Sequence, residues 1–156
     1  MRHQCLALAL IFTAAACAQE TPAEAGMTQQ RLHNVIVAVG DDVFVADNVV
    51  QFTYDGMALL CISDVAADRM RIISPIAELG DVESEQLLLA LAANFHTALD
   101  ARYALSDGVI YAAYIHPLSP LSNDELVSAI RQVATASQTF GTEYTSGALS
   151  FGGTGP

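Results

Sequence analysis

The sequence predicts an α+β domain in the order helix, three-stranded antiparallel meander, helix, β-hairpin, helix. Two observations indicate this order. The stretch from Asp81 to Leu99 repeats apolar residues at helical spacing, and two Asp-Gly pairs separate runs rich in β-branched and aromatic residues. With 156 residues and 53% hydrophobic content, the chain is long enough for one domain with a core, which we place at residues 28–144.

The first predicted element is a short helix that begins at Thr28, a residue type that caps helix N-termini. Apolar residues then recur at helical spacing: Leu32, Val35, Ile36 and Val39. Gly40 follows where a left-handed C-cap is expected. Residues 41–48 form a connector, with an edge strand over 44–46 as the alternative.

The meander begins with a hairpin. The runs 49–54 and 57–63 flank Asp55 and Gly56, a pair that favours a two-residue turn. A third strand is expected over 69–74, and we expect it to end at Pro75, because proline has no N–H for a central ladder position.

The middle helix is predicted to begin at Asp81 as its N-cap. One face of it is apolar: Leu88, Leu91, Ala92, Phe95 and Leu99. An apolar face needs apolar cover, so we expect this helix to pack on the sheet and to organise the fold.

The second hairpin joins 101–105 to 109–116 through a turn that ends at Gly108. Both faces of its second strand are apolar, which predicts that another helix or a second copy of the protein covers the face left over. We take a partner-binding or dimer surface from this strand: Ile110, Tyr111, Ala113, Tyr114 and Ile115. The last helix is expected to begin at Ser122, in a capping box with Glu125.

The N-terminal residues indicate export from the cytoplasm. Residues 1–18 have a polar start, an apolar run and small residues, as in a signal peptide, and 19–27 form a flexible leader. Cleavage before Gln19 would give a periplasmic protein. The alternative is a lipid on Cys17, which would give an outer-membrane lipoprotein. No transmembrane segment is predicted, so the protein would bind a membrane only through this lipid. The tail, 145–156, is rich in Gly and Ser and is expected to be disordered.

The net charge limits the partners that the protein can bind. Seventeen acidic and six basic residues give a net charge of −11, which disfavours nucleic-acid binding.

Few residues are candidates for chemistry. Cys61 lies alone in an apolar strand and is expected to be buried. Arg69 and Arg71 share a strand face and could form an anion-binding patch, unless neighbouring acidic residues balance them. We expect no cofactor and no metal, because the chain has no phosphate-binding loop and no nucleophile motif.

One alternative is a small envelope metal-binding protein or enzyme. His96 and Asp100 lie four residues apart, a spacing that suits metal ligands on one helix face, and His116 ends a strand. Two ligands do not make a site, and His116 has no partnered carboxylate or nucleophile near it in the sequence.

Four segments resemble the type III secretion chaperone-like superfamily, which includes the Tir-chaperone type and the YbjN-like proteins. They are FTYDGMALL, LLLALAANF, ALSDGVIYAAYIHPL and LSNDELVSAI. The resemblance implies a small acidic domain, usually a homodimer, that binds extended segments of partner proteins without catalysis. The secretion chaperones are cytoplasmic, whereas an export signal is predicted here, so the resemblance is to an exported variant. We therefore expect a non-enzymatic module of the bacterial envelope that binds a protein or peptide.

Overall fold

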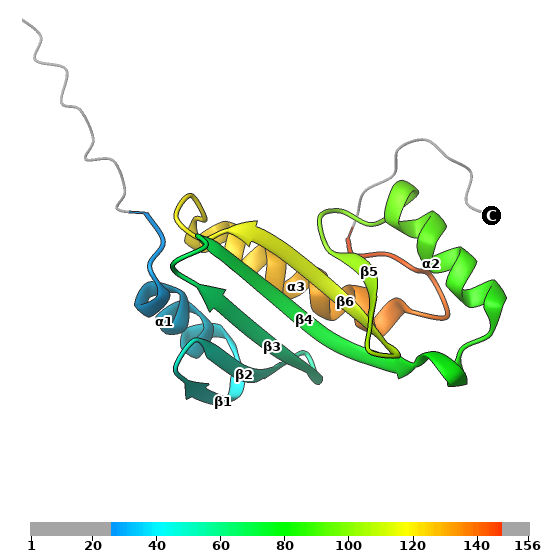
Figure 1. Ribbon diagram of the computed structural model, residues 1–156, viewed down its shortest axis with the longest axis horizontal. Coiled ribbons are helices and arrows are strands. Elements are labelled where there is room, and N and C mark those ends of the chain that lie inside the picture. The colour runs from blue at the N-terminus through cyan, green and yellow to red at the C-terminus, as the bar shows by residue number, and fades with distance from the viewer. Residues whose placement is uncertain (1–25, 148–156) are drawn as a thin grey trace, which may run out of the picture.

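A six-stranded antiparallel sheet and three helices make up the computed structural model, which describes residues 26–147 (Figure 1). The sheet has the strand order β1-β2-β3-β4-β6-β5. The elements are α1 Gln29–Val39, β1 Asp41–Ala46, β2 Val49–Tyr54, β3 Met57–Asp64, β4 Arg69–Glu78, a 3-10 turn Leu79–Asp81, α2 Ser84–His96, β5 Arg102–Ser106, β6 Val109–Pro117 and α3 Asn123–Thr139. The predicted α+β fold is confirmed, and β1 adds an edge strand where the sequence allowed one.

Both Asp-Gly pairs form the turns that the sequence predicts. Asp55 and Gly56 have φ angles of 48° and 76°, and Asp107 and Gly108 have 50° and 80°. Positive φ at both turn residues matches the right-handed twist of the flanking strands. The hairpins β2–β3 and β5–β6 therefore form as expected, with continuous antiparallel register.

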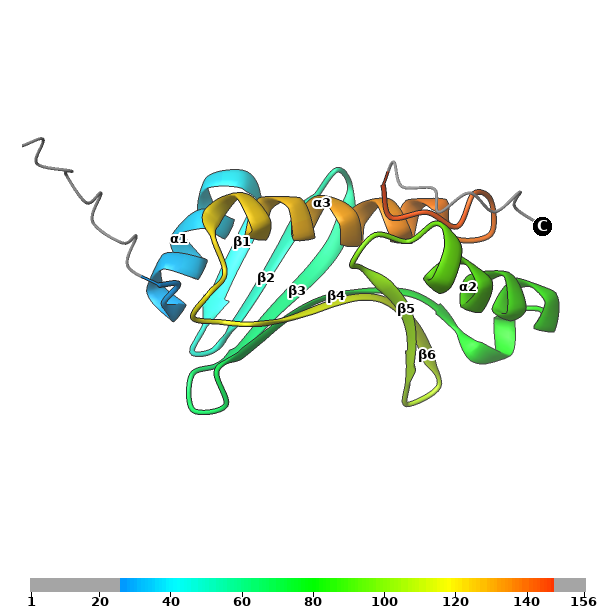
Figure 2. The same ribbon diagram turned by 90° about the horizontal axis from the view of Figure 1, so that it is seen from above.

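Helix α3 covers one face of the sheet, with α1 beside it on the same side (Figure 2). Its N-terminus has the predicted capping box: the Ser122 N–H donates to Glu125 Oε2 at 2.8 Å, and the Glu125 N–H donates to Ser122 Oγ at 3.2 Å. The inward face of α3 mixes large and small buried residues: Leu126, Ala129, Ile130, Val133, Ala134 and Ala136. Small residues let the helix lie close to the sheet, so α3 organises the core.

Strand β4 does not end before Pro75. It continues to Glu78, and its register with β6 shifts between Pro75 and Ala77, which marks a bulge. The last β4 residue paired with β3 is Ile73, so Pro75 lies beyond the end of that ladder. A strand can include proline where no neighbour needs its N–H, so the prediction that Pro75 ends the strand was wrong.

The predicted middle helix forms, but its predicted N-cap and its predicted packing on the sheet were wrong. Asp81 ends the short 3-10 turn, and the N-cap of α2 is Glu83, whose N–H donates to Gln86 Oε1 at 3.1 Å. The helix lies beyond the sheet next to β5, not on the sheet (Figures 1 and 2). Because α3 occupies the sheet face, the apolar face of α2 is left open: Leu88, Leu91 and Phe95 are 67%, 65% and 76% exposed.

The first helix ends differently from its prediction. Thr28 is the N-cap, and its Oγ accepts the Arg31 N–H at 3.2 Å. Gly40, however, has extended backbone, with φ of −97°. A Cβ at this position would lie 2.9 Å from the Phe52 ring, so close packing, and not a left-handed cap, requires glycine here.

The folded part of the chain extends past both ends of the predicted domain. Met27 is buried, and its N–H donates to the Ser119 carbonyl at 3.0 Å. Thr145 is bonded to Thr139, and the buried Ser146 accepts the Leu99 N–H at 2.6 Å. Residues 27 and 145–147 therefore belong to the domain. The predicted signal peptide, Cys17, and the rest of the leader and tail lie outside the described residues.

Candidate functional site

The sheet face opposite α3 is the first candidate surface. Side chains alternate along a strand, and the residues between the buried ones on β3, β4 and β6 point away from α3. They are largely apolar: Leu60, Ile62, Ile73, Tyr111, Ala113 and Ile115. None of the helices in residues 26–147 lies over this face (Figure 2), and Ile115 is 60% exposed. We call these six residues the open sheet face.

The strand register makes the open sheet face continuous. Leu60 lies beside Ile73, which lies beside Ala113, and in the next row Ile62, Arg71 and Ile115 are neighbours. Toward β2 the face is hollowed into a pocket of about 470 Å³. The lining includes Gln51, Thr53, Ala58, Leu60, Ile73, Pro75 and Tyr111. An apolar floor with a hollow of this size suits the side chains of a bound segment.

Two residues of the predicted surface do not belong to this face. Ile110 and Tyr114 lie on the opposite side of β6 and are buried, because alternate residues of a strand point to opposite sides. Tyr111, Ala113 and Ile115 remain on the open sheet face. Their role in binding a partner stays a prediction.

Arg69 and Arg71 are exposed beside the open sheet face. Arg69 lies opposite Asp64 in register and donates to the Asp68 carbonyl at 2.8 Å. Both arginines line a hollow of about 550 Å³ that also includes Asp64. The anion-binding patch stays a prediction, and Asp64 is the acidic neighbour with which an anion would compete.

The exposed stripe of α2 is a second apolar surface, formed by Leu88, Leu91 and Phe95. The opposite side of this helix holds it in place. Asn94 exchanges two hydrogen bonds with the Tyr103 backbone at 3.0 and 2.8 Å, and Ala90 and Ala93 are buried. The helix is therefore fixed through its small and polar residues, and its large apolar residues face outward. We call Leu88, Leu91 and Phe95 the α2 stripe.

The residues of the predicted metal site do not come together. Helix α2 ends at His96, so Asp100 is not one helical turn further along the same face. Asp100 and His116 line one pocket, whereas His96 lines another with Thr142 and Tyr144. Within residues 26–147 no group of three or more His, Cys, Asp or Glu side chains is placed to hold a metal ion.

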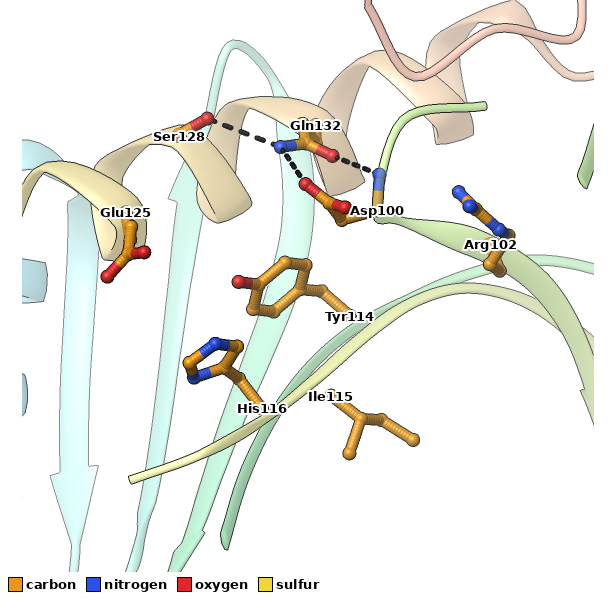
Figure 3. A pocket seen from close by; sticks show the side chains of 8 residues that line it. All are labelled: Asp100, Arg102, Tyr114, Ile115, His116, Glu125, Ser128 and Gln132. Atoms are coloured by element: carbon orange, nitrogen blue, oxygen red, sulfur yellow. Dashed lines mark hydrogen bonds between the residues drawn. The ribbon is translucent and has the colours of Figure 1, made fainter. Parts of the chain in front are cut away.

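The pocket that contains Asp100 and His116 is polar and has a volume of about 410 Å³ (Figure 3). It lies between α3 and β6, beside the start of β5. Its lining is Asp100, Arg102, Tyr114, Ile115, His116, Glu125, Ser128 and Gln132. We call it the α3–β6 pocket.

Gln132 connects the walls of the α3–β6 pocket. Its Oε1 accepts the backbone N–H groups of Asp100 at 2.9 Å and Ala101 at 3.1 Å. Its Nε2 donates to Asp100 Oδ2 at 3.4 Å and to Ser128 Oγ at 3.2 Å (Figure 3). Gln132 is buried in the middle of an apolar helix face, and a polar residue in such a pattern is the signal that could have predicted its role.

Cys61 is buried, as predicted, and burial raises its pKa to about 12. At neutral pH the group is a thiol and not the reactive thiolate. It therefore fills space in the core beneath α3.

A scan against protein-family models gives no match, and a search of curated proteins gives none either. Among solved structures, the chain is similar to a chain of the HopA1-SchA chaperone-effector complex. The TM-score is 0.53 at 18% sequence identity, and the match covers 70% of this chain and 88% of that one. This similarity shows that the two chains share a fold, the chaperone-like α+β arrangement that the sequence predicts.

No helix within residues 26–147 has the combined length and apolar character that crossing a membrane requires.

Proposed function

We propose that this protein is a non-catalytic, chaperone-like module that binds an extended segment of a partner protein. The open sheet face is the observation on which this proposal rests. A sheet normally exposes polar residues on a face that water covers. Here that face is mostly apolar and hollowed. The shared fold with a chain of a chaperone-effector complex supports the same role.

A bound segment would lie across β3, β4 and β6 with alternate side chains pointing into the hollow. Leu60, Ile73 and Tyr111 are part of its lining. An extended segment places every second side chain on one face, so it can present an apolar row to this floor. Binding of this kind needs no bond to be formed or broken.

Photo-crosslinking tests the proposal. Tyr111 is replaced by benzoylphenylalanine, and the control places the same group at Ala66, an exposed residue in the β3–β4 turn. We expect envelope extract to give one dominant crosslinked protein from position 111 and none from position 66. Leu60→Asp should reduce that product several-fold, because a carboxylate in the floor disfavours an apolar side chain. Equal crosslinking from both positions, or no effect of Leu60→Asp, would contradict the proposal.

We propose that the protein forms a homodimer through the α2 stripe. Three large apolar side chains on one exposed helix face are typical of a surface that another protein covers. Twofold symmetry would place the stripe of one copy against that of the other. Light scattering on the purified protein tests this proposal. A monomer across micromolar concentrations would contradict it.

Export to the envelope is also a proposal, based on the pattern of residues 1–18. Mass spectrometry of the protein from cells distinguishes its two forms. A chain that begins at Gln19 indicates a periplasmic protein, and an acylated Cys17 indicates a lipoprotein. A full-length chain that begins at Met1 would contradict export.

A further inference from the structure

The α3–β6 pocket contains a hydroxyl without a partner. The side chain of Tyr114 is 7% exposed, and its ring stacks on His116 with 5.9 Å between ring centroids. Its hydroxyl forms no hydrogen bond within residues 26–147, and Figure 3 shows it directed toward α3, between Asp100 and Glu125. The hydroxyl opens into the pocket, so a ligand there can form a hydrogen bond with it that the protein itself does not provide.

The groups around this hydroxyl are acceptors held in fixed positions. One oxygen of Asp100 is bonded to Gln132, and one oxygen of Glu125 is bonded to the Ser122 backbone. Each carboxylate therefore keeps a second oxygen for a ligand. His116 Nδ1 lies 2.8 Å from the Pro117 carbonyl, an acceptor, so Nδ1 holds the proton and Nε2 is an acceptor in the neutral ring.

The pocket favours a positive charge. The pKa of Tyr114 is raised by burial and by the negative charges of Asp100 and Glu125, so these two carboxylates act together on the hydroxyl. The cation in the lining is Arg102, whose guanidinium is bonded to the carbonyls of Leu99 and Ala101. Figure 3 shows Arg102 at the opposite end of the pocket from Glu125. An anion placed beside Tyr114 would meet both carboxylates.

The shape of the lining favours a flat organic cation over a metal ion. The described residues bring no three metal-binding side chains together. The stacked rings of Tyr114 and His116 form an aromatic wall, and a guanidinium is planar, has five N–H donors and packs on aromatic faces. Such a group could donate to both carboxylates and to the Tyr114 oxygen.

We propose that the α3–β6 pocket binds the guanidinium of an arginine side chain from the partner segment. This inference rests on the proposed function, and it adds a chemical requirement: the partner presents a basic residue on the α3 side of β6, while its apolar residues occupy the open sheet face. The net charge of −11 adds a general attraction for such a partner.

Titration of the purified, ¹⁵N-labelled chain with Nα-acetylarginine methylamide tests the inference by NMR. We expect shifts of the backbone amides of Asp100, Ala101 and Gln132. The matching citrulline derivative, which has nearly the same shape and no charge, should not produce them. Since a millimolar Kd is typical of such a small group, an absence of shifts at about 20 mM would overturn the inference, and so would equal shifts with citrulline.

Three variants separate the pocket from general charge effects. Glu125→Gln keeps the capping box and removes one carboxylate, and should weaken binding about tenfold. Tyr114→Phe should weaken it about threefold, through loss of the hydroxyl. Glu85→Gln removes a similarly exposed charge from the first turn of α2 and should change the Kd less than about twofold. Equal effects of Glu125→Gln and Glu85→Gln would overturn the inference.

The source of the guanidinium is tested with agmatine, a free amine that has the same head group. If agmatine binds more than about tenfold tighter than the arginine derivative, the pocket is a site for a small amine and the partner side chain is ruled out. Crosslinking at Tyr111, which does not line this pocket, tests the proposed function separately. A negative titration would therefore contradict only the arginine site, and a negative crosslinking result would contradict the proposed function.

Discussion

Replacing Gln132 with alanine should destabilise the protein by about 2–4 kcal/mol. The largest part comes from the Ala101 N–H, which is completely buried and donates to Gln132 Oε1 at 3.1 Å. A buried donor left without a partner costs about 1–3 kcal/mol. The loss of one buried methylene adds about 0.8 kcal/mol. The Asp100 N–H is lost as well, but Asp100 is exposed and water can replace that bond.

Urea denaturation of the two proteins, followed by circular dichroism, measures this difference. Gln138→Ala is the matched control, because Gln138 is the same residue type on the same helix. Its Nε2 donates a single exposed hydrogen bond to the Asp55 carbonyl at 2.9 Å. We expect this control to cost no more than about 0.5 kcal/mol. If Gln132→Ala costs less than about 1 kcal/mol, or no more than the control, Gln132 does not hold α3 to the start of β5.

Three further predictions follow from other buried or exposed groups. Ser74→Ala should leave stability unchanged or raise it by about 1 kcal/mol in the same urea assay, because the Ser74 hydroxyl is buried without a partner; a clear loss would contradict this. Burial lowers the pKa of His33 below 6.5, so the native state binds fewer protons than the unfolded state and stability falls as the pH drops below about 6.5. His33→Gln should reduce that fall in urea titrations between about pH 6.5 and 5, and an unchanged pH dependence would contradict the assignment. Leu91→Glu should leave the fold intact, because Leu91 is 65% exposed, and should give a monomer by light scattering, whereas an unaltered dimer would exclude the α2 stripe as the interface.

Local signals in the sequence were sufficient for the two hairpin turns and for the N-caps Thr28 and Ser122, but not for the C-cap of α1 or the N-cap of α2. The Asp55-Gly56 and Asp107-Gly108 turns form as predicted because positive φ at both positions is a property of the residues themselves. The capping box of α3 forms for a similar reason, since both partners lie within one helical turn. Each of these depends on a few neighbouring residues and not on the rest of the fold.

Which helix packs on the sheet was harder to predict from the sequence. All three helices have apolar faces, and helical spacing does not say which of them packs on the middle of the sheet. The stripe of Leu88, Leu91 and Phe95 is the more conspicuous one, yet α3, with Ala129 and Ala136 on its inner face, is the helix that lies against the strands. Small residues permit a close approach, but the inner side of α2 has them too, at Ala90 and Ala93, so this criterion does not separate the two helices.

The α3–β6 pocket could not be predicted as a unit. Asp100 comes from the connection after α2, Tyr114 and His116 from β6, and Glu125 and Gln132 from α3. Their separations in the sequence correspond to no motif, and only the folded chain brings them together. The sequence indicates Asp100 only as a metal ligand beside His96, because a spacing of four residues suits one helix face.

The orientation of α2 follows from what holds it. Asn94 and Thr97 bond to the backbone of Tyr103 and Tyr144, and those two tyrosines contact Phe140 in an aromatic cluster. These contacts fix the helix by its inner side, so the α2 stripe cannot turn inward without breaking them.

The α2 stripe also sets the strength of the proposed dimer. Covering one large apolar side chain is worth about 1.5–3 kcal/mol. A twofold contact would cover six such side chains, a gain comparable with the cost of association, roughly 4–15 kcal/mol. The stripe therefore offsets most of the association cost, and a dimer that persists at micromolar concentrations requires further contacts around its rim.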